Sequence, residues 1–356
     1  MINNRIAPAL TANYLLELAS EPLQAASILR ELTPPKHFDK AEFSNYIPEH
    51  SSQENALNVI AKFIAGLQES GDKGRGFFGK FWGSKVEGKG LYLDGGFGVG
   101  KTHLLASAFH AFSGAKAYLS FQELMFLVGL QSLNGVAESF KNFKLLVIDE
   151  FELDDPANTR ITTNLLGQLF ASGVSILTSS NTPPGALGEG KFSVEDFERE
   201  LGALTKHFYI VKIDGEDYRT VHHLDEGSSS TWVGDDTELE LLLESQNFDS
   251  MKMIDSSFNE FLLALSKVHP MRIRKALGKI DAVILRDVKQ ISHPHEALRF
   301  VYFIDKAYDN NMLLFVSSSV EINDIFHKSY FTGGDTKKYL RTMSRLEEMT
   351  RVSTSF

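Results

Sequence analysis

The sequence predicts an α/β fold in which a parallel sheet is doubly wound with helices. Two stretches, KLLVID at 144–149 and VSILTSS at 174–180, are almost continuously apolar, as strands buried on both faces are. From residue 90 onward, such runs alternate with segments whose apolar residues recur at helical spacing. Alternation of this kind predicts right-handed crossovers between parallel strands, with helices on both faces of one sheet.

The elements of the first part are predicted in chain order. Helices are expected at 8–32 and 54–67, and the Gly- and Lys-rich stretch 71–90 is expected to be a loop. The core should then contain strand 91–94, helix 101–112, strand 116–121, helix 121–131, strand 144–149, helix 157–171, strand 174–180 and strand 208–213. This series is the predicted doubly wound sheet.

A second α/β part is expected after Gly-Ser-Ser-Ser at 227–230, a composition typical of a hinge. Its predicted elements are a helix near 236–246, strand 280–288, helix 294–308, strand 312–319 and a closing helix near 335–351. We therefore divide the chain into three parts: an N-terminal helical segment at 1–75, a core at 76–230, and a C-terminal α/β and lid region at 231–356. No internal repeat is evident in the sequence.

Composition excludes several classes of protein. The chain of 356 residues has no cysteine, which excludes disulfides, thiol catalysis and cysteine-ligated zinc and suits a cytoplasmic location. The first residues lack the apolar run of a signal peptide, and no 18-residue apolar stretch predicts a membrane span. A net charge of −10 gives no general attraction to nucleic acid, whose binding depends on Lys and Arg neutralising phosphates.

A glycine-rich turn joins the first core strand to the first core helix. The pattern G-x-x-x-x-G-K-[ST] is filled by Gly95, Gly100, Lys101 and Thr102. A strand that ends at glycines and continues as a helix leaves unpaired N–H groups facing the turn, where they and the helix dipole favour an anion. We therefore predict a phosphate site that binds ATP, with Lys101 on the β and γ phosphates and the Thr102 hydroxyl on Mg²⁺.

Two acidic residues follow the strand KLLVID, at the sheet edge where α/β proteins bind ligands. Asp149 suits an outer contact to Mg²⁺ beside Thr102, and Glu150 is predicted to polarise the attacking water as a general base. Asn181, which ends the next strand, is predicted to lie between the γ-phosphate and that water. An asparagine that merely starts a turn before two prolines is the alternative for Asn181.

Longer motifs extend beyond these sites. In chain order they are GGFGVGKTHLL, LLVIDEFELDDP, TSSNTPPGAL, IDGEDYR and RTMSRLEEM. Their order and spacing over about residues 35–350 resemble the ZapE-type (AFG1-like) ATPases, a branch of the AAA+ superfamily of P-loop NTPases. The chain is similar to a bacterial member, but GALGEGKF and FERELGAL stand where many relatives have an arginine-rich stretch.

The resemblance implies roles for individual residues. It makes Asp149 and Glu150 the acidic motif of the ATPase and Asn181 its sensor. The implied nucleotide-binding residues are Gly95, Gly96, Phe97, Gly98, Val99, Gly100, Lys101, Thr102 and His103.

Arginines complete the implied site. Arg199 is the candidate that reaches a neighbouring subunit's γ-phosphate, and an ion pair with Glu195 or Glu198 is the alternative. Arg345, or its neighbour Arg341, is the candidate nucleotide-contacting arginine of the lid, with a helix-surface ion pair as the alternative. Arg219 belongs to the family pattern, but its role does not follow from the sequence.

The function implied by the resemblance is Mg²⁺-dependent ATP hydrolysis by a nucleotide-dependent homo-oligomer that acts on a protein partner. In bacteria the family is tied to the division ring, and in mitochondria to protein quality control at the inner membrane, so peripheral membrane association through partners is possible. The alternatives are a helicase loader, which the acidic balance and missing DNA-binding motif disfavour, and a passive nucleotide-stabilised scaffold, which Glu150 disfavours.

Overall fold

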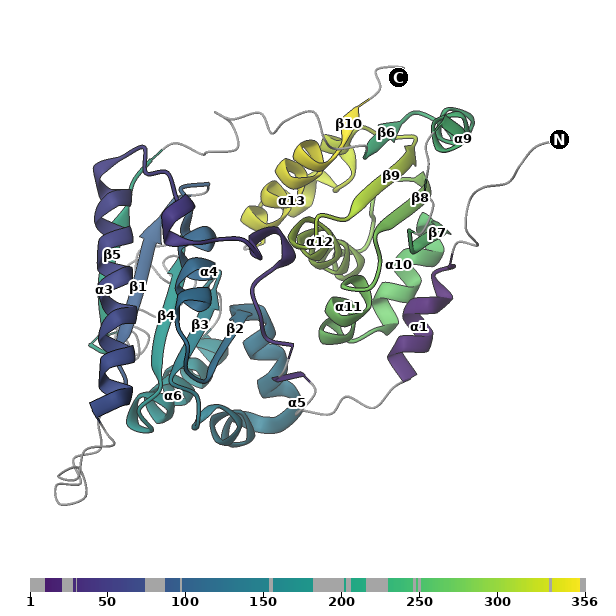
Figure 1. Ribbon diagram of the computed structural model, residues 1–356. Helices are drawn as coiled ribbons and strands as arrows, with labels where there is room; N and C mark the ends of the chain where they lie inside the picture. Colours follow the sequence, from purple (N-terminus) through teal and green to yellow (C-terminus); the bar gives the residue numbers. More distant parts are fainter. Residues whose placement is uncertain are drawn as a thin grey trace. The chain divides into compact units, whose positions relative to one another are not determined.

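The computed structural model divides the chain into two compact units (Figure 1). The N-terminal unit contains Ala25–Pro34 and Phe38–His223, and the C-terminal unit contains Met1–Gln24, Pro35–His37 and Leu224–Phe356. The structure describes residues 10–20, 28–29, 31–73, 87–96, 98–153, 156–181, 202, 206–215, 230–245, 248, 251–332 and 335–352.

A five-stranded parallel sheet forms the centre of the N-terminal unit. Its strands lie in the order β2-β3-β4-β1-β5, and every pairing is parallel. The strands are β1 (Gly90–Gly95), β2 (Lys116–Ser120), β3 (Leu145–Asp149), β4 (Ser175–Ser180) and β5 (Phe208–Ile213). The predicted doubly wound parallel sheet is confirmed.

Helices cover both faces of this sheet. They are α3 (Ser51–Lys73), α4 (Lys101–Ala111), α5 (Phe121–Phe140) and α6 (Pro156–Ala171), with short 3₁₀ turns at η1 (Lys36–Phe38) and η2 (Phe43–Asn45). The crossover from β1 to β2 runs opposite to those from β2 to β3 and from β3 to β4, so right-handed connections place α4 on one face and α5 and α6 on the other. The contacts agree, since α3 packs on α4 and α5 packs on α6.

The C-terminal unit has a five-stranded parallel sheet of its own, in the order β10-β6-β9-β8-β7. The strands are β6 (Thr231–Val233), β7 (Met253–Ser257), β8 (Ala282–Val288), β9 (Leu313–Ser318) and β10 (Arg351–Val352). The helices are α1 (Asn13–Ser20), α9 (Asp236–Ser245), α10 (Phe258–Lys267), α11 (Pro270–Leu277), α12 (Pro294–Asp309) and α13 (Thr336–Met349), with 3₁₀ turns η4 (Ile322–Asp324) and η5 (Lys328–Thr332).

The observed elements differ from the predicted ones in several respects, and the strands β6, β7 and β10 and the helices α10 and α11 were not predicted. The segment 1–75 is shared between the units, because α1 belongs to the C-terminal unit and α3 to the N-terminal unit. Helix α5 continues past the predicted end at 131 to Phe140, with non-helical backbone angles at Ser132. Within the described parts of the chain, no helix combines the length and apolar character needed to cross a membrane.

Candidate nucleotide-binding site

Three glycines at the turn between β1 and α4, Gly95, Gly98 and Gly100, occupy positions that disfavour a larger residue. Gly98 and Gly100 have positive φ angles of 66° and 85°, a region that only glycine enters without cost. A Cβ atom on Gly100 would lie 2.6 Å from Cε2 of Tyr46, and one on Gly95 would lie 2.4 Å from the carbonyl oxygen of Ile213. Sterics therefore select glycine at both ends of the turn.

Lys101 is the first residue of α4, and its side chain is buried against the turn. Its ammonium group donates to the carbonyl oxygens of Gly95, at 2.9 Å, and Gly96. It also donates to Oδ1 of Asn181, at 2.9 Å, at the end of β4. The charge of Lys101 thus lies within the glycine turn, and the turn is joined to the strand whose last polar residue was predicted to sense the γ-phosphate.

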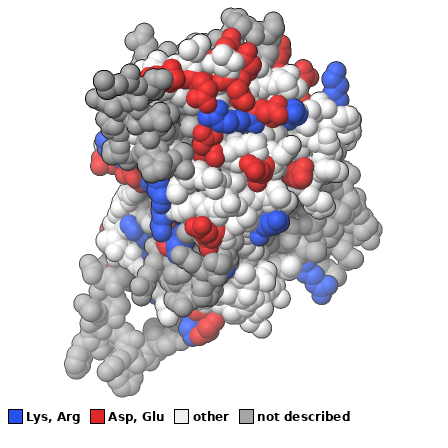
Figure 2. Space-filling view, turned by 90° about the vertical axis from the view of Figure 1, so that its right-hand side faces the viewer, with Lys and Arg blue, Asp and Glu red and all other residues white. Residues whose placement is uncertain are grey.

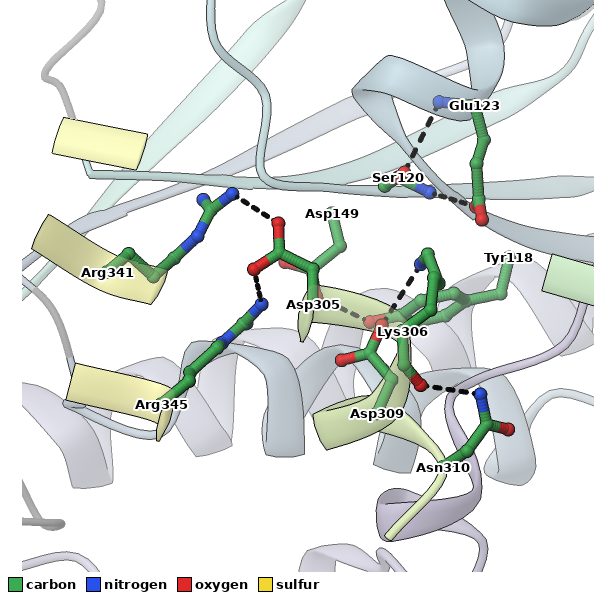
Figure 3. Close-up of polar contacts among 10 residues, drawn as sticks. All are labelled: Tyr118, Ser120, Glu123, Asp149, Asp305, Lys306, Asp309, Asn310, Arg341 and Arg345. Carbon is green, nitrogen blue, oxygen red and sulfur yellow. Dashed lines mark hydrogen bonds and ion pairs between the residues drawn. The ribbon is translucent and has the colours of Figure 1, made fainter. Parts of the chain in front are cut away.

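Asp149 is held from both neighbouring strands. Its Oδ2 accepts a 2.7 Å hydrogen bond from the hydroxyl of Tyr118 on β2, and both residues are drawn in Figure 3. Its Oδ1 accepts from Oγ of Ser179 on β4 and, at 2.9 Å, from the backbone N–H of Glu150. Asp149 is buried, so these donors fix a carboxylate at the sheet edge with its oxygens in a set orientation.

Glu150 has a backbone conformation that is rare for a residue with a side chain. Its φ is 53°, and its N–H donates to Asp149 Oδ1 and, at 3.3 Å, to Ser179 Oγ. A non-glycine residue held in the left-handed region costs about 1–3 kcal/mol, and such residues concentrate at functional sites. The two hydrogen bonds from its N–H hold this strained backbone at the edge of the sheet.

An N-terminal stretch, 43–53, lies over the glycine turn, and sequence reasoning did not foresee it. The Tyr46 hydroxyl donates to the carbonyl of Val99 at 3.2 Å, and its ring centroid is 5.5 Å from that of His103. Nε2 of His103 lies 2.9 Å from Oδ1 of Asn45. Burial and the nearby Glu49 carboxylate raise the pKa of Tyr46 to about 12, so the phenol keeps its proton and can donate at neutral pH.

A further carboxyl group at this edge of the sheet, beside those of Asp149 and Glu150, was not predicted from the sequence. Asp94 lies near the end of β1, in register with Ser180 of β4 and Lys212 of β5. Burial raises the pKa of Asp94, and the positive charges of Lys212 and Lys101 partly oppose that increase. Asp94 is thus a carboxyl group electrostatically coupled to the lysine of the glycine turn.

The predicted arginines lie in other surroundings. Arg341 and Arg345 extend from α13 to the same carboxylate, that of Asp305 on α12 (Figure 3), with Arg341 Nη2 at 2.8 Å from Oδ2. Burial alone would raise the pKa of Asp305, but the two guanidinium groups outweigh burial and lower it. Both arginines are buried in an ion-pair cluster within the C-terminal unit, so a nucleotide contact by Arg345 stays a prediction. Arg199, Arg219 and Phe97 lie outside the described residues.

These features define a class of protein. A glycine turn with a buried lysine, placed between a central parallel strand and a helix, and a buried aspartate at the end of a nearby strand, form the site of a P-loop NTPase. The model of the family described as AFG1-like ATPase matches residues 25–242 and 246–354. The chain therefore belongs to the AFG1-like ATPase family, which confirms the resemblance.

The chain is similar to several individual proteins. The cell division protein ZapE of Escherichia coli K12 is 28% identical over 371 residues, covering 90% of this chain and 96% of that protein. The Lactation elevated protein 1 homolog B of Danio rerio is 22% identical and covers 55% of this chain and 44% of its own length. Among solved structures, DnaI covers 54% of this chain and 99% of its own, at 20% identity and a TM-score of 0.41. The match to the DnaC helicase loader covers 50% of this chain and 99% of that structure, at 20% identity and a TM-score of 0.36.

Proposed function

We propose that this protein is a cytoplasmic, Mg²⁺-dependent ATPase that couples hydrolysis of ATP to action on a protein partner in cell division. The observation that carries the proposal is the contact between Lys101 and Asn181, which are 80 residues apart and 2.9 Å from each other at the glycine turn. The similarity to ZapE supports a division-ring component as the partner, and protein quality control is the alternative process.

The residues present fit a Mg²⁺–ATP complex. Mg²⁺ prefers oxygen ligands and usually keeps several waters, and the Thr102 hydroxyl with the fixed Asp149 carboxylate would supply oxygen donors of that kind. Bound Mg²⁺ would neutralise charge on the phosphate oxygens. In the proposed site, the N–H groups of the glycine turn and the Lys101 ammonium orient the phosphates, and Glu150 accepts a proton from the attacking water while Asn181 holds that water in line.

Assembly of several copies is part of the proposal. Arg199 would complete the site of a neighbouring subunit, where positive charge stabilises the transferring phosphoryl group. The ATPase rate should then rise more steeply than linearly with protein concentration. A specific activity that is constant across a wide dilution series would contradict an arginine supplied by a neighbour.

Lys101→Ala tests the phosphate site directly. The variant removes the charge that faces the phosphates, and charge-assisted hydrogen bonds contribute about 1.5–3 kcal/mol, so affinity for a non-hydrolysable ATP analogue should fall roughly 10- to 100-fold. Calorimetric titration measures the change. Lys141→Ala is the matched control, because Lys141 is an exposed lysine paired with Glu138, and its affinity should equal that of the wild type. An unchanged affinity in Lys101→Ala would exclude the site.

A helicase-loader function remains the second candidate. It predicts that single-stranded DNA binds the protein and changes its ATPase rate. The net charge of −10 disfavours this, since phosphate-backbone contacts provide most of such affinity. A rate that is the same with and without single-stranded DNA at low salt would support the protein-partner proposal.

A further inference from the structure

The two sheets have the same topology. Reading the second sheet from its other end gives β7-β8-β9-β6-β10, which is the order β2-β3-β4-β1-β5 with five added to each number. In the common doubly wound orders of dinucleotide- and FMN-binding folds, the first strand neighbours the second. Here two strands separate the first from the second in both sheets, so the units share the less common arrangement.

Strand register extends the match to individual residues. Ser120 lies opposite Asp149 in the first sheet, and Ser257 lies opposite Arg286 in the second. Each of these serines is the N-cap of the following helix and accepts from the N–H of a glutamate three residues on, at 3.3 and 3.4 Å. The sequences are Ser-Phe-Gln-Glu at 120–123 and Ser-Phe-Asn-Glu at 257–260.

The edge of the third strand also matches. Glu150, after β3, has a φ of 53°, and Asp287, at the equivalent position of β8, has a φ of 56°. The N–H of Glu150 donates to Oγ of Ser179 at 3.3 Å, and the N–H of Asp287 donates to Oγ of Ser317 at 2.9 Å. The same strained residue is thus bound by the same serine of the adjacent strand in each unit.

The helix that follows the first strand of each sheet, α4 or α9, packs on equivalent strand positions. Right-handed crossovers place α9 on one face of its sheet, as they place α4, and they place α10, α12 and α13 on the opposite face, where α12 contacts both α10 and α13. The strand residues in the α4 core include Leu93, Leu145, Val147 and Leu177, and their equivalents in the α9 core are Val233, Ala282, Ile284 and Phe315.

The units differ where phosphate would bind. Five residues, 96–100, join β1 to α4, whereas only Gly234 and Asp235 join β6 to α9. Oδ1 of Asp235 accepts from the N–H of Glu238 at 2.9 Å, and Oε2 of Glu238 accepts from the N–H of Gly234 at 3.2 Å. Asp236, the first residue of α9, accepts from Oγ of Ser317. The carboxylates of Asp235 and Glu238 therefore occupy two backbone N–H groups, those of Glu238 and Gly234, at the place where a phosphate would bind.

Charge at the rest of this edge is also unsuited to a nucleotide. Acidic side chains gather at the top of the face shown in Figure 2. Helix α9 carries four acidic residues of its own, Asp236, Glu238, Glu240 and Glu244, and negative charge repels phosphate. In the second sheet, Arg286 occupies the position equivalent to that of Asp149 in the first. Arg286 makes ion pairs with Asp255 and Glu240, each at 2.7 Å, so a cation stands where a carboxylate would attract Mg²⁺.

We infer that the C-terminal unit is a second P-loop-type domain whose phosphate site is closed by its own carboxylates, so that each chain binds one nucleotide, in its N-terminal unit. The nucleotide count rests on the proposed function, whereas the closed second site does not. The duplicated unit keeps the strand order, caps and strained edge residue of an ATPase domain but contributes no ATP site.

Titration of the full chain with Mg²⁺ and a non-hydrolysable ATP analogue tests the count. We expect the wild type to bind one analogue per chain. In Lys101→Ala, no site should bind the analogue with the affinity of the wild type. Two sites in the wild type, or one site of unchanged affinity that survives Lys101→Ala, would overturn the inference. No binding in either protein would contradict the proposed ATPase while agreeing with a closed second site.

Asp235→Ala tests whether the carboxylate closes the site, because Oδ1 of Asp235 accepts from the N–H of Glu238 at the start of α9. Loss of this acceptor should lower the melting temperature of the C-terminal unit by roughly 4 °C. Emission from Trp232, which is buried in β6, reports that unit in a Trp82→Phe background. Glu244→Ala, an exposed acid on the same helix, should change the melting temperature by less than about 1 °C. Equal melting temperatures for the two variants would overturn the role of Asp235.

Discussion

Glu150→Gln should lower the rate of ATP hydrolysis by about 10²–10⁴-fold while ATP stays bound. The amide keeps the size of the side chain and the left-handed backbone of this residue, whose φ is 53°, but it accepts no proton from water. Lys101 and Asp149 are unchanged, so the phosphate and metal contacts should remain. Single-turnover hydrolysis measures the chemical step, and analogue affinity measures binding.

The control for this variant is Glu138→Gln, because Glu138 is exposed and pairs with the exposed Lys141. Its hydrolysis rate and affinity should equal those of the wild type. The trapped Glu150→Gln–ATP complex should also retain protein partners in a pull-down. Near-wild-type hydrolysis in Glu150→Gln would mean that another group accepts the proton, and a parallel loss of affinity would mean that Glu150 acts mainly in binding.

The residues that lie on one motif could be predicted, because their positions follow from local chain geometry. The Gly95–Thr102 turn joins a strand to a helix, and Asp149 ends a strand that is buried along its whole length. The groups that orient these residues could not be predicted in this way. Tyr118 lies 31 residues from Asp149, and Tyr46 lies 53 residues from Val99, so only the folded chain brings them together.

The fold of the N-terminal unit was predictable because β3 and β4 are buried along their whole length and strands alternate with helices along the chain. In the C-terminal unit, β8 and β9 were predicted from their apolar runs, but β6 has three residues and β10 has two, too few for a periodic pattern. The relationship between the units was missed as well. The shared residues are a capping serine, a strained acid and a serine of the adjacent strand, and they are scattered among positions that need only be apolar.

Asp305→Asn should destabilise the C-terminal unit by about 3–5 kcal/mol, the usual effect of removing one member of a buried ion pair. Asp305 accepts from both Arg341 and Arg345, and the side chains of all three residues are about one-tenth exposed. The amide would remove the carboxylate charge that both guanidinium groups share. Unfolding followed by Trp232 emission in the Trp82→Phe background measures the change. Asp335→Asn, which breaks the more exposed pair with Lys338, should cost about 0–1 kcal/mol.

The pH dependence of the destabilisation by Asp305→Asn distinguishes the loss of the carboxylate charge from a disturbance of packing. The pKa of Asp305 is lowered in the folded protein, because the attraction of Arg341 and Arg345 exceeds the opposing effect of burial. A carboxyl group with a lowered folded pKa stabilises the protein above its unfolded pKa of about 3.9, and the contribution is lost as pH falls through the folded pKa. The difference in free energy of unfolding between the wild type and Asp305→Asn should therefore be largest at pH 6 to 7 and should decrease below about pH 4. A difference that stays constant down to pH 3 would show that the amide disturbs packing and that the carboxylate charge contributes little.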